Sequence, residues 1–332
     1  MGIIISLVAV IALTLVAWIG AGTLGLHYLF GVIIPYLALA AFVFGLIYRV
    51  VKWAKAPVPF KITTTCGQQK SLPWIRHNKL ESPFTGWQVF GRMLLEILFF
   101  RSLFRNTKMA LKKGPRLVYG SEKYLWLAGL AFHYSFLVIV LRHLRFFIEP
   151  IPGFVMAIQN LDGFFQVGLP IIYITDGVIL AALVFLFFRR VINPKVRYIS
   201  LAADYFPLFL IGAIALTGIL MRYFEAFKAE LIAVKELAIG LVGFSPVVPE
   251  GLDVIFFIHL FLVSVLLMYF PMSKLVHMGG VFLSPTRNLA NNNRNRRHVN
   301  PWNPDVKVHT YEEYEDEFRE LMKAADMPLE KE

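Results

Sequence analysis

Long apolar runs limit this chain to one kind of environment. Each run approaches or exceeds the roughly 20 residues that cross the hydrocarbon core of a bilayer. Hydrophobic residues make up 57% of the 332-residue chain, whereas about 45–50% is usual in a soluble domain. We therefore predict an all-α integral membrane protein with six transmembrane helices, at residues 3–20, 29–48, 124–148, 164–188, 199–221 and 253–277.

The first run is also the shortest. A signal peptide is the alternative reading, but the run lacks the basic start that such peptides show. We expect a span, joined to the second by a short turn at residues 20–25. The chain has one cysteine, Cys66, and a single thiolate cannot hold an iron–sulfur cluster, which needs about four ligands. Any metal must therefore use histidine or carboxylate ligands.

The charges of the loops alternate along the chain. Residues 52–123 carry 14 Lys/Arg against 3 acids, and residues 189–197 carry four basic residues. The loop at 149–163 has no basic residue. Because basic loops stay on the cytoplasmic side, we expect a multi-pass protein of the cytoplasmic membrane with both termini in the cytoplasm. Topology thus accounts for the net charge of +11, and we expect no nucleic-acid partner.

Four units follow from these patterns. Residues 1–52 form two N-terminal spans, 53–123 a cytoplasmic insert, 124–283 a four-helix block and 284–332 a cytoplasmic tail. Within the insert, the apolar stretch 87–105 contains Arg92, Glu96, Arg101 and Arg105. It predicts a helix that lies on the membrane surface with its arginines reaching toward water.

The tail contains a second amphipathic segment. Apolar side chains recur at helical spacing between acids from Tyr311 to Ala325. One interpretation is a solvated helix folded against its own loops. The other is a docking helix for a cytoplasmic partner.

Four of the eight histidines fall in two predicted spans, His133 and His143 in the third and His259 and His277 in the sixth. The two spans run in opposite directions, so each level of the membrane offers one histidine from each. Two imidazoles facing across a gap are the axial ligands of a haem b. We therefore predict two haems b, with His133/His277 at the cytoplasmic level and His143/His259 at the outer level. The others are expected to be solvated or to form ordinary hydrogen bonds: His27, His77, His298 and His309.

Helical geometry requires some distortion in this arrangement. The eighteen residues from His259 to His277 return to one helix face, whereas the ten from His133 to His143 do not. Pro271 is a natural kink site between the second pair. Haem propionates need cationic partners, and at the outer level the candidates are Arg142, Arg145 and Arg222. The cations at the cytoplasmic level are expected to be interfacial anchors: Lys274, Arg189, Arg190 and Arg197.

The histidine spacings, the string "HLFLVSVLLMYFPMSKLVH" and the loop "RRVINPKVRYISLAAD" together resemble the gamma subunit of respiratory nitrate reductase. That family is a five-helix dihaem cytochrome b that oxidises quinol, and the resemblance covers roughly residues 29–285. The chain differs by an extra N-terminal span, by a long insert containing "TTTCGQQKSLPWI", and by lacking an evident counterpart of the family's lysine near the quinol. The insert and tail resemble the cytochrome b subunits of heterodisulfide-reductase-like menaquinol oxidoreductases of sulfate reducers.

These resemblances imply a subunit of a quinol-oxidising oxidoreductase complex. Menaquinol would be oxidised near the outer haem, and electrons would pass to a cytoplasmic iron–sulfur subunit like heterodisulfide reductase, alongside other subunits of a complex linked to sulfate respiration. The quinol-pocket candidates at the outer end are Arg142, Glu149, Asp162 and Gln166. Asp176, predicted to lie mid-span, is a further functional candidate.

Two other functions fit parts of the same pattern. A transporter with a histidine/carboxylate proton relay would bind no haem and would need more intramembrane acids than Asp176 and Asp204. A haem-free anchor would only tether the iron–sulfur partner. A reduced-minus-oxidised absorbance spectrum separates the first of these from a cytochrome.

Overall fold

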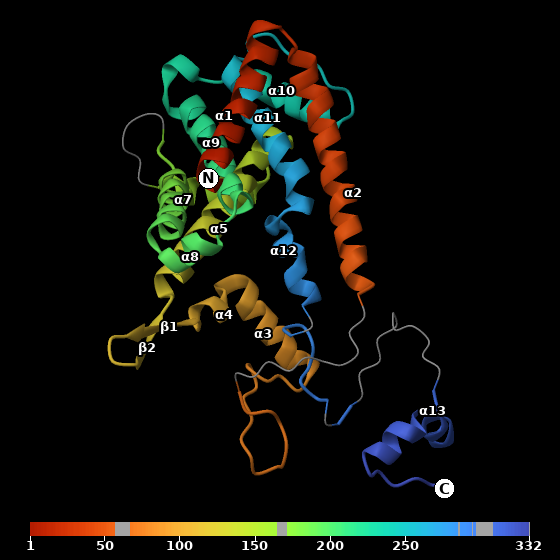
Figure 1. Ribbon diagram of the computed structural model, residues 1–332. Coiled ribbons are helices and arrows are strands. Elements are labelled where there is room, and N and C mark those ends of the chain that lie inside the picture. The colour runs from red at the N-terminus through yellow and green to blue at the C-terminus, as the bar shows by residue number, and fades with distance from the viewer. Residues whose placement is uncertain (57–66, 165–170, 285, 294, 297–307, 332) are drawn as a thin grey trace.

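The structure is a computed structural model that describes residues 1–56, 67–164, 171–284, 286–293, 295–296 and 308–331. Five helical segments are long and apolar enough to cross a membrane (Figure 1). Each contains one α-helix, and four of the five also include a π-helical or a 3-10 turn. They are α1 (Gly2–Ala17) with η1 (Trp18–Thr23), η2 (Leu29–Ile33) with α2 (Ile34–Ala54), α5 (Lys123–His143) with its 3-10 turn η3 (Leu144–Phe146), α9 (Ala202–Tyr223), and α11 (Val254–Tyr269) with η5 (Phe270–Met272).

The helix in the region of the predicted fourth span starts later than predicted. The helix there, α7 (Ile174–Ile192), begins ten residues later than the predicted 164. Residues 171–173, directly before this helix, are not helical. The helix carries Asp176 in its first turn and Arg189 and Arg190 in its last. A sixth span therefore stays a prediction, although α7 packs along α5 and α9.

Tight packing holds α1 against the rest of the bundle. The Ser6 hydroxyl lies 2.8 Å from the carbonyl oxygen of Ala202 at the start of α9, and Ala17 and Ala21 are fully buried. The side chain of Phe30 fills the space that a Cβ on Gly20 would need. The first segment is thus an integral part of the bundle, whose core is centred on Phe257, Leu210, Leu237 and Leu262.

The last span is broken, as the position of Pro271 suggests. Helix α11 ends at Tyr269, and the 3-10 turns η5 and η6 (Lys274–Val276) follow on either side of Ser273, whose backbone is extended. His277 then begins the one-turn helix α12 (His277–Gly280), which leads into η7 (Val281–Leu283). His259 and His277 are therefore carried by different helices.

The insert has more structure than one surface helix. Helix α3 (Gly86–Phe99) ends at Phe100, whose φ of 48° is left-handed, and α4 (Arg101–Phe104) follows. An antiparallel hairpin, β1 (Thr107–Lys112) and β2 (Arg116–Ser121), adds two strands to the predicted all-α fold. Arg92 does not reach toward water as predicted. It is buried and donates to the carbonyl oxygen of Glu81 at 3.3 Å, because residues 67–85 fold over that face of α3.

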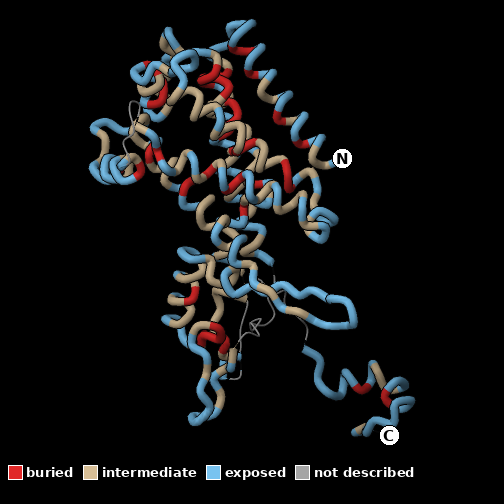
Figure 2. The backbone as a smooth tube through the Cα atoms, turned by 90° about the vertical axis from the view of Figure 1, so that its left-hand side faces the viewer, coloured by how far each residue is buried: buried red, intermediate tan, exposed pale blue. Residues whose placement is uncertain are grey.

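The insert and the first part of the tail form one unit. Asn291 is fully buried, its Nδ2 donates to Ser82 Oγ at 3.2 Å, and Gln69 Nε2 donates to its carbonyl oxygen at 3.1 Å. Arg287 pairs with Glu96 at 3.2 Å. We call the end of the bundle beside this unit the insert end and the opposite end the far end. Figure 2 shows most buried residues in the bundle, with smaller groups in the insert and near the C-terminus.

The remaining helices are short. Those at the far end are α6 (Gly153–Asp162), η4 (Glu225–Phe227) and α10 (Leu231–Val242), and α8 (Pro194–Ile199) follows α7 at the insert end. Helix α13 (Tyr311–Ala324) lies near the C-terminus. Its Glu315 is buried and accepts the backbone N–H groups of Glu330 and Lys331, so the helix folds against its own tail. Tyr311, Tyr314 and Leu321 remain exposed.

Candidate functional site

His143 and His259 lie side by side at the far end of the bundle. Their ring centroids are 6.5 Å apart and their planes differ by 9°. His143 Nδ1 donates to the carbonyl oxygen of Ile139 at 2.7 Å. His259 Nδ1 lies 2.9 Å from Thr217 Oγ1, whose hydroxyl also lies 2.9 Å from the Ala213 carbonyl oxygen. Since the single hydroxyl proton goes to that carbonyl, the imidazole donates to the threonine oxygen.

His133 and His277 form the corresponding pair at the insert end. Their ring centroids are 6.0 Å apart and their planes differ by 80°. Nδ1 of His133 donates to Gly129 O and Nδ1 of His277 to Lys274 O, both at 2.7 Å. All four histidines thus use Nδ1 in a hydrogen bond, which leaves Nε2 as the nitrogen able to bind a metal.

The spacing of both pairs suits one metal ion held between two imidazoles. A metal–nitrogen bond of about 2 Å on each side places the two ring centroids roughly 6 Å apart. A ligating histidine normally donates its other ring N–H to a carbonyl or another acceptor, as all four do. The described residues contain no group of three or more His, Cys, Asp or Glu side chains that could hold a metal. Two protein ligands suffice for haem, because the porphyrin supplies the other four nitrogens.

The surroundings of the rings leave room for a larger group. His133, His143 and His277 are exposed although they lie between helices. Gly218 lies next to His259, and a Cβ there would come within 3.4 Å of the His259 Cε1 atom. The residues present therefore fit a haem at each pair, a cofactor that the sequence pattern also predicts.

A buried ionic cluster lies beside His143. The guanidinium of Arg142 is 3.2 Å from Asp162 Oδ2 and 2.9 Å from Asp176 Oδ1. Thr175 donates its backbone N–H and its hydroxyl to Asp162, at 2.9 and 2.7 Å. The Tyr223 hydroxyl donates to Asp176 at 2.7 Å. The cluster joins the far ends of α5, α6, α7 and α9.

Tyr173 lies between two of the predicted propionate partners. The guanidinium carbons of Arg142 and Arg222 are 3.7 and 3.9 Å from its ring centre. Arg222 also donates to the carbonyl oxygen of Ile171 at 3.1 Å, and Arg145 donates to Gln159 Oε1 at 2.8 Å. Each of the three arginines therefore has a partner within the protein.

The predicted quinol-pocket residues do not form one group. Arg142 and Asp162 are in contact, whereas Glu149 lies apart and pairs with Lys235 of α10. Gln166 lies outside the described residues. The prediction that Asp176 is mid-span is wrong, because α7 begins only two residues before it, and the N-terminal turn of a helix favours an acid.

Cations at the insert end pair with acids of the chain. Lys274 and Arg190 lie 2.7 and 3.9 Å from Asp204, which is buried at the start of α9. Arg189 lies 3.6 Å from Glu122. Their expected role as interfacial anchors stays a prediction.

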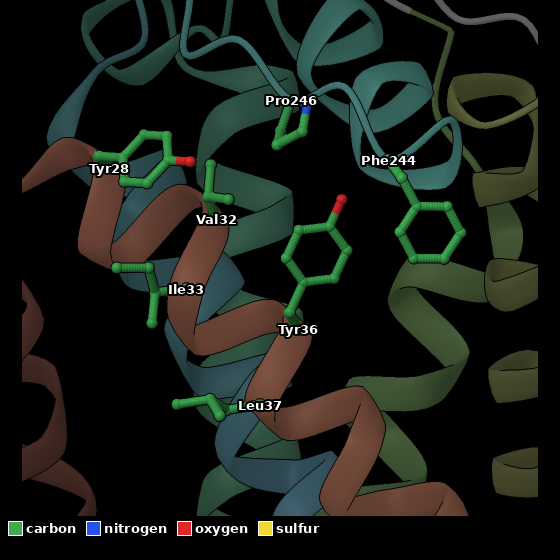
Figure 3. A pocket seen from close by; sticks show the side chains of 7 residues that line it. All are labelled: Tyr28, Val32, Ile33, Tyr36, Leu37, Phe244 and Pro246. Carbon is green, nitrogen blue, oxygen red and sulfur yellow. The ribbon is translucent and has the colours of Figure 1, made fainter.

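An open apolar groove of about 450 Å³ lies at the far end, between η2–α2 and the loop after α10. Figure 3 shows the Tyr36 and Phe244 rings at the same level of this groove. Their planes are parallel within 1°, and the Tyr36 hydroxyl donates to the Leu241 carbonyl oxygen at 2.9 Å. Nearby, His27 stacks on Phe257 with centroids 4.9 Å apart. None of the predicted ligand or quinol residues lines this groove.

Some residues of the site carry no clear sequence signal. The acceptors of His133 and His143 are carbonyl groups four residues earlier in the same helix, which helical spacing alone supplies. Thr217, Tyr173 and Tyr223 reach the site only through packing between helices.

Comparisons with known proteins agree with this geometry. A sequence model of the nitrate reductase gamma subunit matches residues 87–294, which include all four histidines. A protein of Archaeoglobus fulgidus named Hdr-like menaquinol oxidoreductase cytochrome b-like subunit is 49% identical over 283 residues, 83% of this chain and 84% of the relative. A protein of the same name from Archaeoglobus profundus is 44% identical over 282 residues, 83% of each chain.

Proposed function

Because the chain belongs to the nitrate reductase gamma subunit family, we propose that it is the membrane cytochrome b subunit of a menaquinol oxidoreductase complex. In this role His133 and His277 hold one haem b and His143 and His259 the other. Menaquinol is oxidised near the outer pair, and electrons pass to a cytoplasmic iron–sulfur subunit resembling heterodisulfide reductase. The relatives named as menaquinol oxidoreductase subunits support the quinol and the complex.

One observation carries the proposal. Two histidine pairs, at opposite ends of the bundle, have centroids 6.0 and 6.5 Å apart, and each of the four rings donates its Nδ1–H. This arrangement supports axial ligation, because a ligating histidine normally donates its other ring N–H, and that hydrogen bond fixes the tautomer and the ring orientation.

The haems, when bound, supply one-electron redox chemistry across the membrane. The protein holds their axial nitrogens and organises the quinol end. Of the two predicted quinol-pocket carboxylates, Glu149 is the more accessible, with a side chain 60% exposed against 3% for Asp162, so it can accept a quinol proton. Asp162 and Asp176 instead pair with Arg142 and hold the helix ends together.

The orientation of the complex follows from charge. The insert and residues 189–197 are basic and would lie in the cytoplasm, so His133 and His277 would be the pair nearest an iron–sulfur partner. Helix α13 belongs to the same side and leaves Tyr311, Tyr314 and Leu321 exposed. An exposed apolar group of this kind suits a docking helix.

A pyridine haemochrome assay and a reduced-minus-oxidised spectrum of the purified chain test the proposal. Two haems b per chain, reducible by a menaquinol analogue, are expected. One haem, or none, on a fully loaded preparation contradicts it. A haem-free spectrum would favour one of the two haem-free alternatives, the proton-coupled transporter or the anchor. Histidine variants that leave electron transfer intact would favour the anchor.

A further inference from the structure

The segment that carries His277 is not supported by the helix before it. Pro271 cannot donate a backbone hydrogen bond, and α11 ends at Tyr269. In a continuous helix the N–H of Leu275 would bond to the carbonyl oxygen of Pro271. It donates instead to Ser273 Oγ at 3.1 Å. Residues 270–276 therefore need support from other parts of the fold to give His277 a defined position.

Helix α2 supplies a complementary face. On its second half the partly buried residues follow helical spacing, whereas Phe44, Ile47 and Tyr48 point outward and are 71%, 55% and 56% exposed. The inward residues are Phe42, Gly45, Leu46, Arg49 and Trp53. All five face the broken segment or α12.

The contacts along this face are close. The Phe42 and Phe270 rings meet edge to face, with centroids 5.5 Å apart. A Cβ on Gly45 would lie 2.8 Å from Pro271 Cβ, so any side chain there would displace the proline. Leu46 and Trp53 continue the contact to Gly279 and Gly280. The helix thus touches the chain on both sides of His277.

Among the described residues, Arg49 makes the one polar contact between this face of α2 and the broken segment at residues 270–276. Its Nε donates to the carbonyl oxygen of Pro271 at 2.9 Å, the same oxygen that Leu275 does not use. A buried carbonyl without a donor is destabilising, so the arginine satisfies a group that the break leaves open. Three residues later, the Lys274 carbonyl accepts the Nδ1–H of His277.

Helix α9 holds the opposite side. Lys274 pairs with Asp204 at 2.7 Å, and the Tyr269 hydroxyl lies 3.5 Å from the Ala203 carbonyl oxygen. The segment is thus held between α9 and α2. Helix α2 lies outside residues 87–294, the part that matches the family.

We propose that Arg49 is a positioning residue, and that the α2 face around Gly45 and Arg49 sets the orientation of His277 toward its metal. The inference rests on the proposed function, because it requires a haem between His133 and His277. It assigns to the N-terminal helices a role in the electron-transfer site. The His143/His259 pair, which lies in continuous helices, does not depend on this face.

Redox titration of the two haem components in the purified full chain, with low-spin electron paramagnetic resonance, tests the proposal. The component lost in His277→Ala identifies the insert-end haem. Arg49→Met keeps the length of the side chain but removes the donor. It should shift the midpoint potential and the g-values of that component only. Arg49→Lys, which keeps a donor, should restore them in part.

Controls come from the same helix. Lys52→Met removes an exposed cation one turn away and should change neither component. Gly45→Val, expected to push on Pro271, should disturb the same component as Arg49→Met, and Ile47→Val on the exposed face should not. If Arg49→Met does not accumulate, Phe42→Leu provides a milder change in the same contact.

The outcomes separate the two proposals. If His277→Ala removes no component, the proposed function fails. If it removes one, but Arg49→Met, Phe42→Leu and Gly45→Val leave that component unchanged or shift both components equally, the positioning role is wrong and the cytochrome proposal stands.

Discussion

The two histidine pairs have similar spacing but depend on different supports. His143 and His259 belong to long helices, and their hydrogen-bond acceptors come from regular helix geometry and one threonine on α9. His277 follows a broken helix and is held by contacts from α2 and α9. Regular helices can place a ligand by local structure alone, whereas a broken segment needs tertiary contacts. We therefore expect the insert-end pair to be the more sensitive to distant substitutions.

The largest expected effects come from the histidines themselves. His143→Ala and His259→Ala should remove the same spectral component, and His133→Ala and His277→Ala the other, because each haem needs both imidazoles. Haem content should fall from two to one per chain in each variant, measured by pyridine haemochrome. If His133→Ala and His143→Ala removed the same component, the proposed pairing of the histidines would be wrong. The comparison between an insert-end pair and a far-end pair would then be wrong as well.

Arg142→Leu should destabilise the far end strongly. It would leave Asp162 and Asp176 without their common cation in a buried site, and removing one partner of a buried ion pair costs about 3–5 kcal/mol. Thermal unfolding of the detergent-solubilised chain measures the loss. Arg145→Leu is the matched control, because the hydrogen bond described for the Arg145 side chain goes to the uncharged Gln159. Equal stability of the two variants would show that the cluster does not hold the helix ends.

Thr217→Val should weaken the far-end haem specifically. The substitution keeps the shape of the side chain but removes the acceptor of His259 Nδ1–H. Loss of such an outer contact costs about 10–100-fold in metal affinity. Haem retention during dilution is the measurement, and Thr217→Ser should retain normal affinity. A loss confined to the insert-end component would contradict the assignment of Thr217 to this pair.

Removal of residues 308–332 should have the smallest effect on the haems. Helix α13 makes its described hydrogen bonds and ion pairs within residues 309–331, so both components should stay assembled and quinol-reducible. Co-purification of the iron–sulfur partner should be lost, because the exposed Tyr311, Tyr314 and Leu321 are removed with it. If the truncated chain retained the partner at full stoichiometry, the docking role of α13 would be wrong. The helix would then only fold against its own tail.

Much of the helical fold was predictable. Apolar runs marked the positions of the five membrane-length helices, because a bilayer demands a minimum length whatever the packing. The hairpin at Thr107–Ser121 was not predicted, since a two-stranded ribbon carries little sequence signal and is marginal alone. The start of α7 was misplaced because an apolar run does not reveal where a helix inside it begins.

The candidate site, like the fold, was predictable only in part. The depths of the four histidines follow from residue counts and from the alternation of loop charges, so their arrangement in two pairs was available before any coordinates. The partners of Arg142 could not be predicted in this way. Asp162 and Asp176 lie on other helices, and no sequence pattern links either of them to Arg142. An arginine near a predicted haem suggested a propionate partner, which stays a prediction, and the structure shows Arg142 paired with two carboxylates of the chain.

The sequence by itself identified the apolar segments that are long enough to cross a membrane, and from it we predict their alternating directions and the depth of each imidazole. These properties depend on the hydrophobicity and charge of each segment taken alone. Only the tertiary structure decided which groups hold those imidazoles in orientation. Thr217 reaches His259 from another helix, and Arg49 satisfies the carbonyl that Pro271 leaves open. Such contacts join residues far apart in the chain, and no pattern within one segment encodes them.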